Sequence, residues 1–343
     1  MTPIFCIKAE IQINLPFGDN ITTIKVDNYS RILFQNVNSL EMSTGQHTLE
    51  NTCDGIGSYE RDIACLAETN TRWKHYLGES ILRSTSKRHW KNFYITTSET
   101  DLPEAALYKP GGTAIITQQP LCNGIINSGQ DPHELGRWFY IIISGRDNSI
   151  ITIISAYRIS DISVQTVGLI TNTKQQWNIL KERDQEHEDN RHKTIIDIST
   201  FINSLTQQNN EVLLGIDSNE PNILYNKGVS QLLQRTKLID AIDEFHGLYK
   251  VPNTYIQGRH RVDFFLSTKY ISTFIDRSGI TSFNEVTTSN HRGKFIDLRL
   301  RDFLKTSYAS ISNASSRTLQ STNTKSVVKY KQHLKPFLII NRF

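Results

Sequence analysis

Short runs of apolar and β-branched residues recur along the chain and predict strands. They occupy residues 31–36, 62–67, 92–96, 113–117, 138–144, 150–157, 211–216, 262–266 and 294–300. Runs of this length that are bounded by polar turns are typical of buried strands. The apolar stretch from Phe139 to Ala156 is interrupted by the turn-forming residues 145–149, so it predicts a hairpin rather than a membrane span.

Apolar positions at helical spacing lie between the later strands. They predict helices over 165–182, 193–208 and 228–244. Nine strands exceed what one compact sheet needs, so we expect two sheets packed face to face with helices outside. We therefore predict an α+β fold, a four-layer α/β/β/α sandwich of two mixed β-sheets flanked by helices.

The chain of 343 residues shows no clear linker between its strands. We predict an N-terminal extension at 1–29, one domain at 30–302 and a basic C-terminal tail at 303–343. The alternating residues Ile11–Leu15 suit either an added edge strand or a poorly ordered segment. The tail has no Asp or Glu and a formal charge of +7. Because the whole chain has a formal charge of +4, residues 1–302 carry −3. Such a tail suits contact with nucleic-acid phosphates, and a solubilising or disordered tail is the alternative.

The composition, 38% hydrophobic and 21% charged, is that of a globular domain with a large core. Cys6, Cys53, Cys65 and Cys122 have no paired spacing, which favours reduced thiols. The first residues contain no long apolar block, so we expect no secretory signal and no membrane association. These features predict a nuclear or cytoplasmic protein.

Six short polar segments follow or close apolar runs, and each supplies a group useful in phosphodiester chemistry. They are Asn36-Val37-Asn38, Glu68-Thr69-Asn70, Tyr157-Arg158, Asp217-Ser218-Asn219, Arg261-Val262-Asp263 and Ser289-Asn290-His291. Their amide and carboxylate oxygens suit a hard cation. His291 is the general base candidate, and Asp263 can orient it. Singly, the asparagines suit turns, Glu68 a strand end and His291 a structural role. All six in one chain favour a metal-dependent phosphoesterase.

Two other segments invite functional interpretations that the sequence does not favour. Gly111-Gly112 precedes β-branched residues, so it predicts the entry to a strand rather than a phosphate-binding loop. His187 and His192 lie five residues apart among charges of alternating sign, which favours a solvated connection over a metal site.

The order of the six segments resembles the endonuclease/exonuclease/phosphatase superfamily. That group includes pancreatic-type deoxyribonucleases, abasic-site endonucleases and the endonuclease domains of non-long-terminal-repeat retrotransposons. The resemblance covers about residues 30–300. It rests on Phe34-Gln35-Asn36-Val37-Asn38, Cys65-Leu66-Ala67-Glu68-Thr69, Ile154-Ser155-Ala156-Tyr157-Arg158, Gly215-Ile216-Asp217-Ser218-Asn219-Glu220, Thr254-Tyr255, Arg261-Val262-Asp263-Phe264-Phe265-Leu266 and Ser289-Asn290-His291-Arg292.

The resemblance implies Mg²⁺ as cofactor, with Mn²⁺ as a substitute, and DNA as partner. It implies metal ligands at Glu68, Asn38, Asn36 and Asn290. The same resemblance implies roles in the reaction for five residues. Asp217 orients or deprotonates the attacking water, Asn219 holds a phosphate oxygen, Tyr157 positions the phosphate or leaving group, and His291 acts with Asp263 beside the phosphate. Phosphate or DNA contacts are predicted at Arg158, Thr254 and Ser289, although turn and strand roles suit Thr254 and Ser289 equally.

One residue departs from the family pattern. An aspartate precedes the closing histidine in the family, whereas this chain has Asn290, which offers an oxygen without a charge. We expect weaker metal binding as a result. The prediction is therefore a DNA-nicking endonuclease that leaves 3′-hydroxyl ends. The alternatives are a phosphatase of the same fold and a catalytically decayed DNA-binding copy.

Longer strings within the chain resemble retroelement endonucleases found beside a reverse transcriptase. These strings are Glu68-Thr69-Asn70-Thr71-Arg72-Trp73, Leu135-Gly136-Arg137-Trp138 and Ile153-Ile154-Ser155-Ala156-Tyr157-Arg158. The chain contains no Y-x-D-D centre of a reverse transcriptase. The resemblance thus implies a reverse transcriptase that is encoded separately or has been lost.

Overall fold

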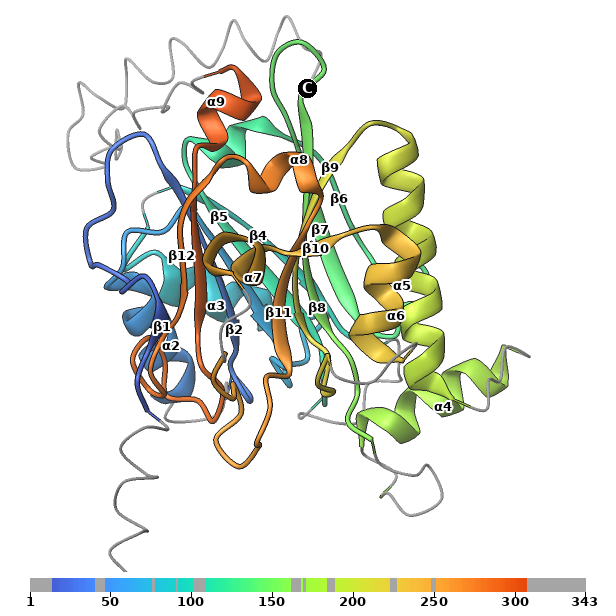
Figure 1. Ribbon diagram of the computed structural model, residues 1–343. Coiled ribbons are helices and arrows are strands. Elements are labelled where there is room, and N and C mark those ends of the chain that lie inside the picture. Colours follow the sequence, from blue (N-terminus) through green and yellow to red (C-terminus); the bar gives the residue numbers. More distant parts are fainter. Residues whose placement is uncertain are drawn as a thin grey trace, which may run out of the picture. The chain divides into compact units, whose positions relative to one another are not determined.

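The computed structural model describes residues 14–306 apart from 41–46, 76–77, 91, 101–108, 162–167, 169–170, 184–188, 223–226 and 248–250. The chain divides into two compact units, Met1–Tyr308 and Ala309–Phe343, and every described residue belongs to the first. The sheets and helices of that unit are shown in Figure 1.

Two mixed β-sheets form the first unit. The first sheet has the strand order β1 (Phe17–Gly18), β12 (Ile275–Ile280), β13 (Lys294–Leu298), β2 (Ser30–Asn36), β3 (Ile63–Ala67), β5 (Thr113–Gln118) and β4 (Phe93–Ser98). The second has the order β10 (Ile239–Asp240), β11 (Asp263–Ser267), β9 (Glu211–Asp217), β8 (Ile150–Tyr157), β7 (Trp138–Ser144) and β6 (Ile125–Gln130). Strands β2 and β3 are parallel, as are β8 and β9, while the other described pairs are antiparallel.

The inner faces of the two sheets pack against each other. Alternate residues of β2, Ile32 and Phe34, belong to the same buried cluster as Phe265 of β11. The rings of Phe34 and Phe265 meet edge to face with centroids 6.1 Å apart. A Cβ at Gly215 would lie 2.4 Å from the Phe34 ring, so only glycine allows the sheets to approach this closely. The period-two alternation of these strands therefore builds the central layer.

Helices cover the outer faces of both sheets. Helices α2 (His47–Gly57) and α3 (Gly78–Ser86) bury Leu49 and Leu82 against the first sheet, in one cluster with Leu33. Helices α5 (Asn190–Gln207) and α6 (Gly228–Thr236) bury Ile198 and Leu232 against the second. The remaining helices are α4 (Asn172–Glu182), α7 (Ala241–His246), α8 (Lys269–Ser272), α9 (Leu300–Leu304) and the 3₁₀ turn η1 (Leu121–Gly124). The predicted α/β/β/α sandwich is confirmed (Figure 1).

All nine strands expected from the hydrophobic pattern are present, with boundaries shifted by at most two residues. The helix expected at 193–208 begins at Asn190, because the Asp189 side chain caps it by accepting from the backbone N–H groups of Arg191 and His192. Within the range 165–182, residues 165–167 and 169–170 lie outside the described residues, and the helix begins at Asn172.

The single helix expected at 228–244 is wrong. Helix α6 ends at Thr236, because Lys237 adopts a left-handed conformation (φ 59°) that reverses the chain into β10. Strands β6 and β12 were not predicted from the sequence. Their sequences, IINSGQ and IDRSGI, carry polar residues and glycine instead of an alternating apolar pattern.

Several smaller expectations are also resolved. The turn at 145–149 closes a hairpin between β7 and β8, with the Gly145 N–H donating to the Ser149 carbonyl at 2.7 Å. Gly111 and Gly112 lead into β5, as predicted. Cys53, Cys65 and Cys122 are free thiols, while Cys6 and His187 lie outside the described residues. No helix in the described part of the chain is long and apolar enough to cross a membrane.

Described residues on both sides of 30–302 contact the sandwich. Strand β1 pairs with β12, although the alternating residues 11–13 before it lie outside the described part. In α9, Phe303 and Leu304 are buried in the central layer. The domain limits 1–29, 30–302 and 303–343 stay a prediction.

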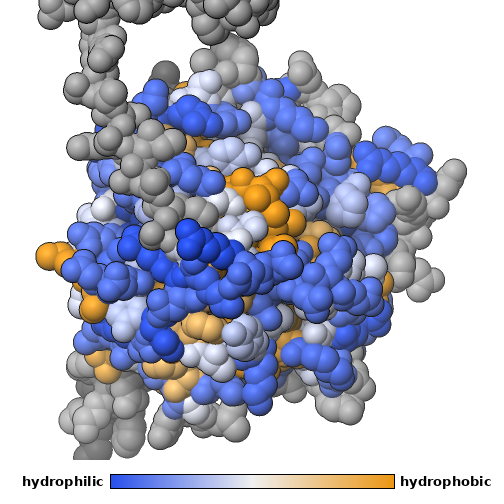
Figure 2. All heavy atoms as spheres, turned by 90° about the horizontal axis from the view of Figure 1, so that it is seen from above, coloured by the Kyte–Doolittle hydropathy of each residue, from blue (hydrophilic) through white to orange (hydrophobic). Residues whose placement is uncertain are grey.

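The two ends of the sandwich differ. Leu304 of α9 accepts a backbone hydrogen bond from Arg146 in the β7–β8 turn, so α9 lies at the end opposite the last residue of β8, Tyr157. Figure 2 looks down on the α8–α9 end, where the described surface is mostly hydrophilic, with a hydrophobic area near the centre and smaller ones elsewhere. The polar segments singled out from the sequence gather at the other end.

Candidate active site

The strand directions explain why distant polar segments converge. The parallel pairs β2–β3 and β8–β9 end at the same edge of their sheets, which brings Asn36, Glu68, Tyr157 and Asp217 to that edge. Strands β11 and β13 run antiparallel to β9 and β2, so they begin where those strands end. Asp263 opens β11 directly opposite Asp217. The site therefore forms at the mouth of the layer between the two sheets.

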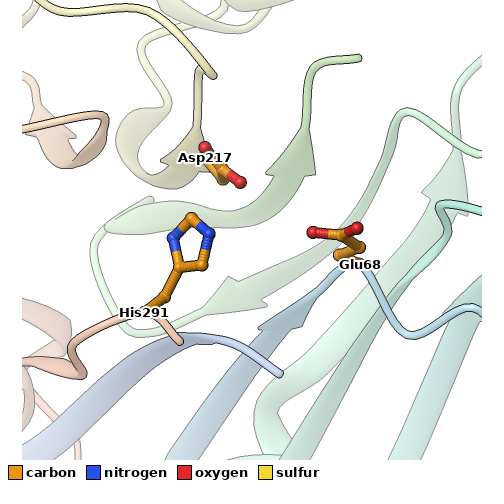
Figure 3. A group of neighbouring side chains, drawn as sticks. All are labelled: Glu68, Asp217 and His291. Carbon is orange, nitrogen blue, oxygen red and sulfur yellow. The ribbon is translucent and has the colours of Figure 1, made fainter. Parts of the chain in front are cut away.

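Glu68, Asp217 and His291 form a tight cluster at this mouth. One potential ligand atom from each lies within 4.8 Å of the others, and Figure 3 shows the three side chains pointing toward one another from separate elements. The Asn36 side-chain amide joins the two carboxylates. Its Nδ2 donates to Glu68 Oε2 at 2.8 Å and to Asp217 Oδ2 at 2.6 Å.

A second group of charges lies behind His291. His291 Nδ1 is 3.0 Å from Asp263 Oδ2, and Lys294 Nζ is 3.3 Å from the same oxygen. Lys294 also donates to the Arg292 carbonyl at 2.8 Å. Asp263 and Lys294 are fully buried, and His291 is only 6% exposed. The carboxylate therefore fixes the imidazole ring and leaves Nε2 as its second functional nitrogen.

Burial and mutual repulsion favour the protonated forms of the two clustered carboxyls. Burial first, and then the negative charge of Asp263, raise the pKa of Asp217 to about 7. Burial also raises the pKa of Glu68, although the hydrogen bond from Asn36 opposes the rise. Crowded carboxyls of this kind gain from a cation or a proton placed between them.

The Asp263 group has the opposite balance. Burial disfavours the Asp263 carboxylate, but the charges of Lys294 and His291 outweigh it and lower the pKa of Asp263 to about 2. Burial opposes the imidazolium of His291, yet Asp263 and Asp217 raise its pKa to about 9. Burial lowers the pKa of Lys294 to about 8. Near neutral pH, His291 is therefore a cation beside a charged Asp263.

The backbone is strained where the site residues lie. Asn38, Glu68 and Asn219 have φ values of 45°, 53° and 48°, in the left-handed region that residues with a side chain rarely adopt. Hydrogen bonds hold this conformation: the Ser39 N–H donates to the Glu68 carbonyl, and the Asn219 N–H donates to Asp217 Oδ1 at 2.9 Å. Such conformations cost of order 1–3 kcal/mol each and concentrate at functional sites.

The donor set fits a hard divalent cation. Glu68 and Asp217 supply carboxylate oxygens to the cluster. The buried Oδ1 of Asn290, the residue before His291 in sequence, makes no hydrogen bond with the described residues. An unpaired buried acceptor is costly unless a ligand or solvent completes it. The described residues of the cluster include no thiolate and a single histidine, which favours Mg²⁺ or Mn²⁺ over softer metals.

Solved structures share this architecture. The AP endonuclease LMAP from Leishmania major matches with a TM-score of 0.58 and 12% identity, covering 85% of this chain and 95% of that one. The 3′ phosphatase NExo from Neisseria, bound to a product DNA hairpin, matches with a TM-score of 0.52 and 13% identity, covering 78% and 99%. The human Nocturnin catalytic domain matches with a TM-score of 0.52 and 14% identity, covering 80% and 95%.

This chain has the DNase-I-like fold. No protein-family profile and no curated protein sequence matches it. At identities this low the structural likeness establishes the fold alone. The active chemistry has to be argued from the residues of the site.

Within this DNase-I-like fold, the three residues predicted to contact phosphate have hydrogen-bond partners in the protein. Arg158 is 4% exposed, and its guanidinium pairs with Glu220 and donates to the carbonyl oxygens of Arg191 and Ser218. Thr254 Oγ1 accepts from the backbone N–H groups of Val262 and Asp263. Both side chains are therefore buried and paired within the protein, and their predicted contacts with phosphate or DNA stay a prediction.

Ser289 also has partners within the protein. Its hydroxyl donates to the Asn36 carbonyl at 2.7 Å and accepts from the His291 N–H at 3.1 Å. It therefore fixes the loop that carries His291 relative to the end of β2. The turn role left open by the sequence applies to both Ser289 and Thr254.

The other predicted residues lie at the site mouth. Tyr157 pairs in register with Asp217, so their side chains share the inner face of the second sheet. Asn219 Nδ2 donates to the Arg158 carbonyl at 2.7 Å, which holds it beside Asp217. Asn38 is exposed, and its described contact with the cluster is the backbone N–H donating to Asn36 Oδ1 at 2.8 Å.

Sequence reasoning missed two residues that shape the site. Lys294 was counted only as part of a strand, although period-two alternation with Ile296 and Leu298 places it on the inner face. Asn70 Oδ1 accepts from the Gly111 N–H at 2.7 Å, and the Asn70 amide lowers the pKa of Glu68 against the larger effect of burial. The sequence marks Asn70 as part of the polar segment Glu68-Thr69-Asn70 but not its role, because that role depends on the left-handed turn after β3.

Proposed function

We propose that this chain is a divalent-metal-dependent phosphodiesterase that nicks DNA and leaves 3′-hydroxyl ends. The observation that carries the proposal is the convergence of Glu68, Asp217 and His291 within 4.8 Å at one edge of a DNase-I-like sandwich. The hydrogen bond between His291 and Asp263 completes a group suited to acid–base chemistry beside a phosphate.

A divalent cation bound here would neutralise charge on the phosphate and on the leaving oxygen. Glu68 and the oxygen of Asn290 would hold it, with Asn36 and Asn38 beside them. Asp217 would accept the proton of the attacking water, because burial raises the pKa of its carboxyl in the metal-free protein and makes the carboxylate a stronger base than a solvated one. The imidazolium of His291 stabilises the negative charge that grows on the phosphate oxygens.

Exposed residues beside the site favour a nucleic acid over a small phosphate. The Tyr255 ring lies 5.0 Å from the His291 ring, and the loop that follows exposes Ile256, Arg259 and His260. The NExo structure contains a DNA product, and two of the other similar structures are of AP endonucleases. The predicted basic tail adds phosphate-binding charge in the same chain.

The proposal includes an origin in a retroelement. The strings around Glu68, Trp138 and Tyr157 support it, and a separately encoded or lost reverse transcriptase is part of the same hypothesis. A nuclear or cytoplasmic location fits both the DNA substrate and the free thiols of Cys53 and Cys65.

The test is nicking of supercoiled plasmid, with Mg²⁺ or with EDTA, by wild type and Glu68→Ala. We expect wild type alone to give open circles, only with Mg²⁺, and a DNA polymerase to extend the nicks directly from their 3′-hydroxyl ends. Glu134→Ala is the matched control, because Glu134 is a half-exposed glutamate that pairs with Lys74 and is not a member of the cluster. A phosphatase would instead leave the plasmid intact and release phosphate from a 3′-phosphorylated oligonucleotide.

One residue favours the alternative of a decayed copy. Asn290 lacks the charge found at this position in the family it resembles. Binding of DNA without cleavage in either Mg²⁺ or Mn²⁺ would support that alternative and contradict the endonuclease proposal.

A further inference from the structure

Helix α4 has two different faces. Its buried face includes Ile179 and Leu180, which cluster with Leu135, and Gln176, whose side chain donates to the Leu135 carbonyl. Its outer face carries Lys174, Trp177 and Lys181, spaced three and four residues apart so that they lie in one row. Among the described residues of α4 the acidic one is Glu182, which comes directly after Lys181.

Trp177 differs from the other tryptophans of the chain. Trp73, Trp90 and Trp138 are at most 5% exposed, whereas Trp177 is half-buried. Lys174 Nζ lies 4.2 Å and Lys181 Nζ 4.8 Å from the centre of the Trp177 ring. An accessible indole between two ammonium groups is thus available on the outside of the protein.

The start of α4 is tied to the candidate active site. Asn172, its first residue, packs on Gly111, where a Cβ would lie 2.1 Å from Asn172 Nδ2. Gly111 in turn exchanges two hydrogen bonds with Asn70, at 2.8 and 2.7 Å, and Asn70 lies two residues after Glu68 in the turn that follows β3. Figure 1 shows α4 beside the end of the sandwich where β8 finishes.

We propose that the Lys174–Trp177–Lys181 row binds the DNA strand on one side of the cleaved phosphate, with an unpaired base stacked on Trp177. This inference rests on the proposed function and adds the substrate feature that the enzyme recognises, an unpaired base near the cut. The two lysines are about 10 Å apart along the helix axis, which spans about three phosphates of a B-form strand. Their side chains reach phosphates on either side of the stacked base.

The energetics favour exchange of partners on binding. In the free protein the lysine ammoniums lie near the indole, a contact that is weak at exposed positions. A base that stacks on the ring replaces them, and the released ammoniums then meet phosphate charges. The two lysines therefore lie over the indole in the free protein and turn to the phosphates when a base stacks on the ring.

The test is binding of oligothymidylate, and of a fully paired duplex of the same length, in EDTA so that no cleavage occurs. Because Trp177 is the accessible tryptophan, its stacking should quench part of the intrinsic fluorescence of wild type, and Trp177→Phe should remove that change. Trp177→Ala should weaken binding of the single strand about 5- to 150-fold, the loss expected for one base stack. Binding of the duplex should change less.

Lysine variants separate charge from stacking. Lys174→Gln with Lys181→Gln should lower the slope of log affinity against log salt by about 1.4 for the single strand. The matched control is Lys269→Gln with Tyr270→Ala, an exposed lysine–aromatic pair on α8 at the other end of the sandwich. This control should bind as wild type does.

Equal binding by wild type and Trp177→Ala, or no fluorescence change at saturation, would overturn the inference. Hydrolysis of bis(p-nitrophenyl) phosphate needs no stacked base, so Trp177→Ala should keep it. Normal diester hydrolysis with unaltered DNA binding would reject the α4 site and leave the proposed function standing. If wild type does not hydrolyse the diester but binds DNA in a way that depends on Trp177, the proposed function is rejected and the α4 site stands.

Discussion

Removal of the Asp217 carboxyl should change how stability depends on pH. Burial raises the pKa of Asp217 from 3.8 to about 7. A raised folded-state pKa contributes stability that is fully present below 3.8 and is lost as pH rises through about 7. Three pKa units correspond to about 4 kcal/mol, so the metal-free protein should lose stability of that order over this range through Asp217 alone.

The assay is denaturant unfolding in EDTA at a series of pH values, for wild type and Asp217→Ala. The substitution also removes acceptors for Asn36 and Asn219, a cost that does not depend on pH, so the slope of the difference is the informative quantity. We expect the stability of wild type relative to Asp217→Ala to fall by about 4 kcal/mol between about pH 4 and pH 8. Asp147→Ala is the matched control, since its carboxylate is exposed.

Added Mg²⁺ should reverse the loss. A cation favours the ionised carboxyls, so stabilisation by Mg²⁺ should be larger at pH 8 than at pH 5, reaching about 2.7 kcal/mol at one hundred times the dissociation constant. Asp217→Ala should gain much less. A difference between the two proteins that stays constant across pH would refute the assigned environment of Asp217.

Three further substitutions test other parts of the site. His291→Ala should lower the cleavage rate by about a hundredfold or more, and a loss below about threefold in single-turnover kinetics would remove His291 from the mechanism. Asn290→Asp should lower the Mg²⁺ concentration for half-maximal cleavage, because a charge replaces the unpaired amide oxygen; an unchanged Mg²⁺ titration would show that the amide suffices. Lys294→Met should lower the free energy of unfolding in urea by about 3–5 kcal/mol, because it leaves the buried Asp263 carboxylate without one of its charged partners. Lys305→Met should cost less than about 1 kcal/mol, because its pair with Asp147 is exposed; equal losses would contradict the role of Lys294.

The hydrophobic pattern predicted most of the fold because its strands are buried. In β9, for example, residues 212–216 carry no polar side chain and are all buried, and the strand lies between β8 and β11. β12 was not predicted, because its sequence, Ile-Asp-Arg-Ser-Gly-Ile, lacks an apolar pattern. It is a strand because its backbone pairs with β13. The break between α6 and α7 depends on one left-handed residue, Lys237, which helical periodicity does not report.

The residues of the site were found because polar groups at strand ends interrupt apolar runs. Their partners were harder to predict. Arg158 also lies at a strand end, but its guanidinium pairs with Glu220 in the loop after β9 and donates to the Arg191 carbonyl in α5. Asn36 was expected to offer an oxygen, but its amide nitrogen donates to two carboxylates. Such choices follow from side-chain packing among segments far apart in sequence.

The central claim is that Glu68, Asp217 and His291 hydrolyse a phosphodiester with the help of a divalent cation. The most direct measurement is single-turnover hydrolysis of bis(p-nitrophenyl) phosphate, with Mg²⁺, Mn²⁺ or EDTA, by wild type and by the Glu68→Ala, Asp217→Ala double variant. This substrate removes any contribution from DNA binding. We predict metal-dependent hydrolysis by wild type and none above background by the double variant, with both proteins folded by circular dichroism. Equal hydrolysis by the two proteins, or hydrolysis by wild type that is unaffected by EDTA, would contradict the claim.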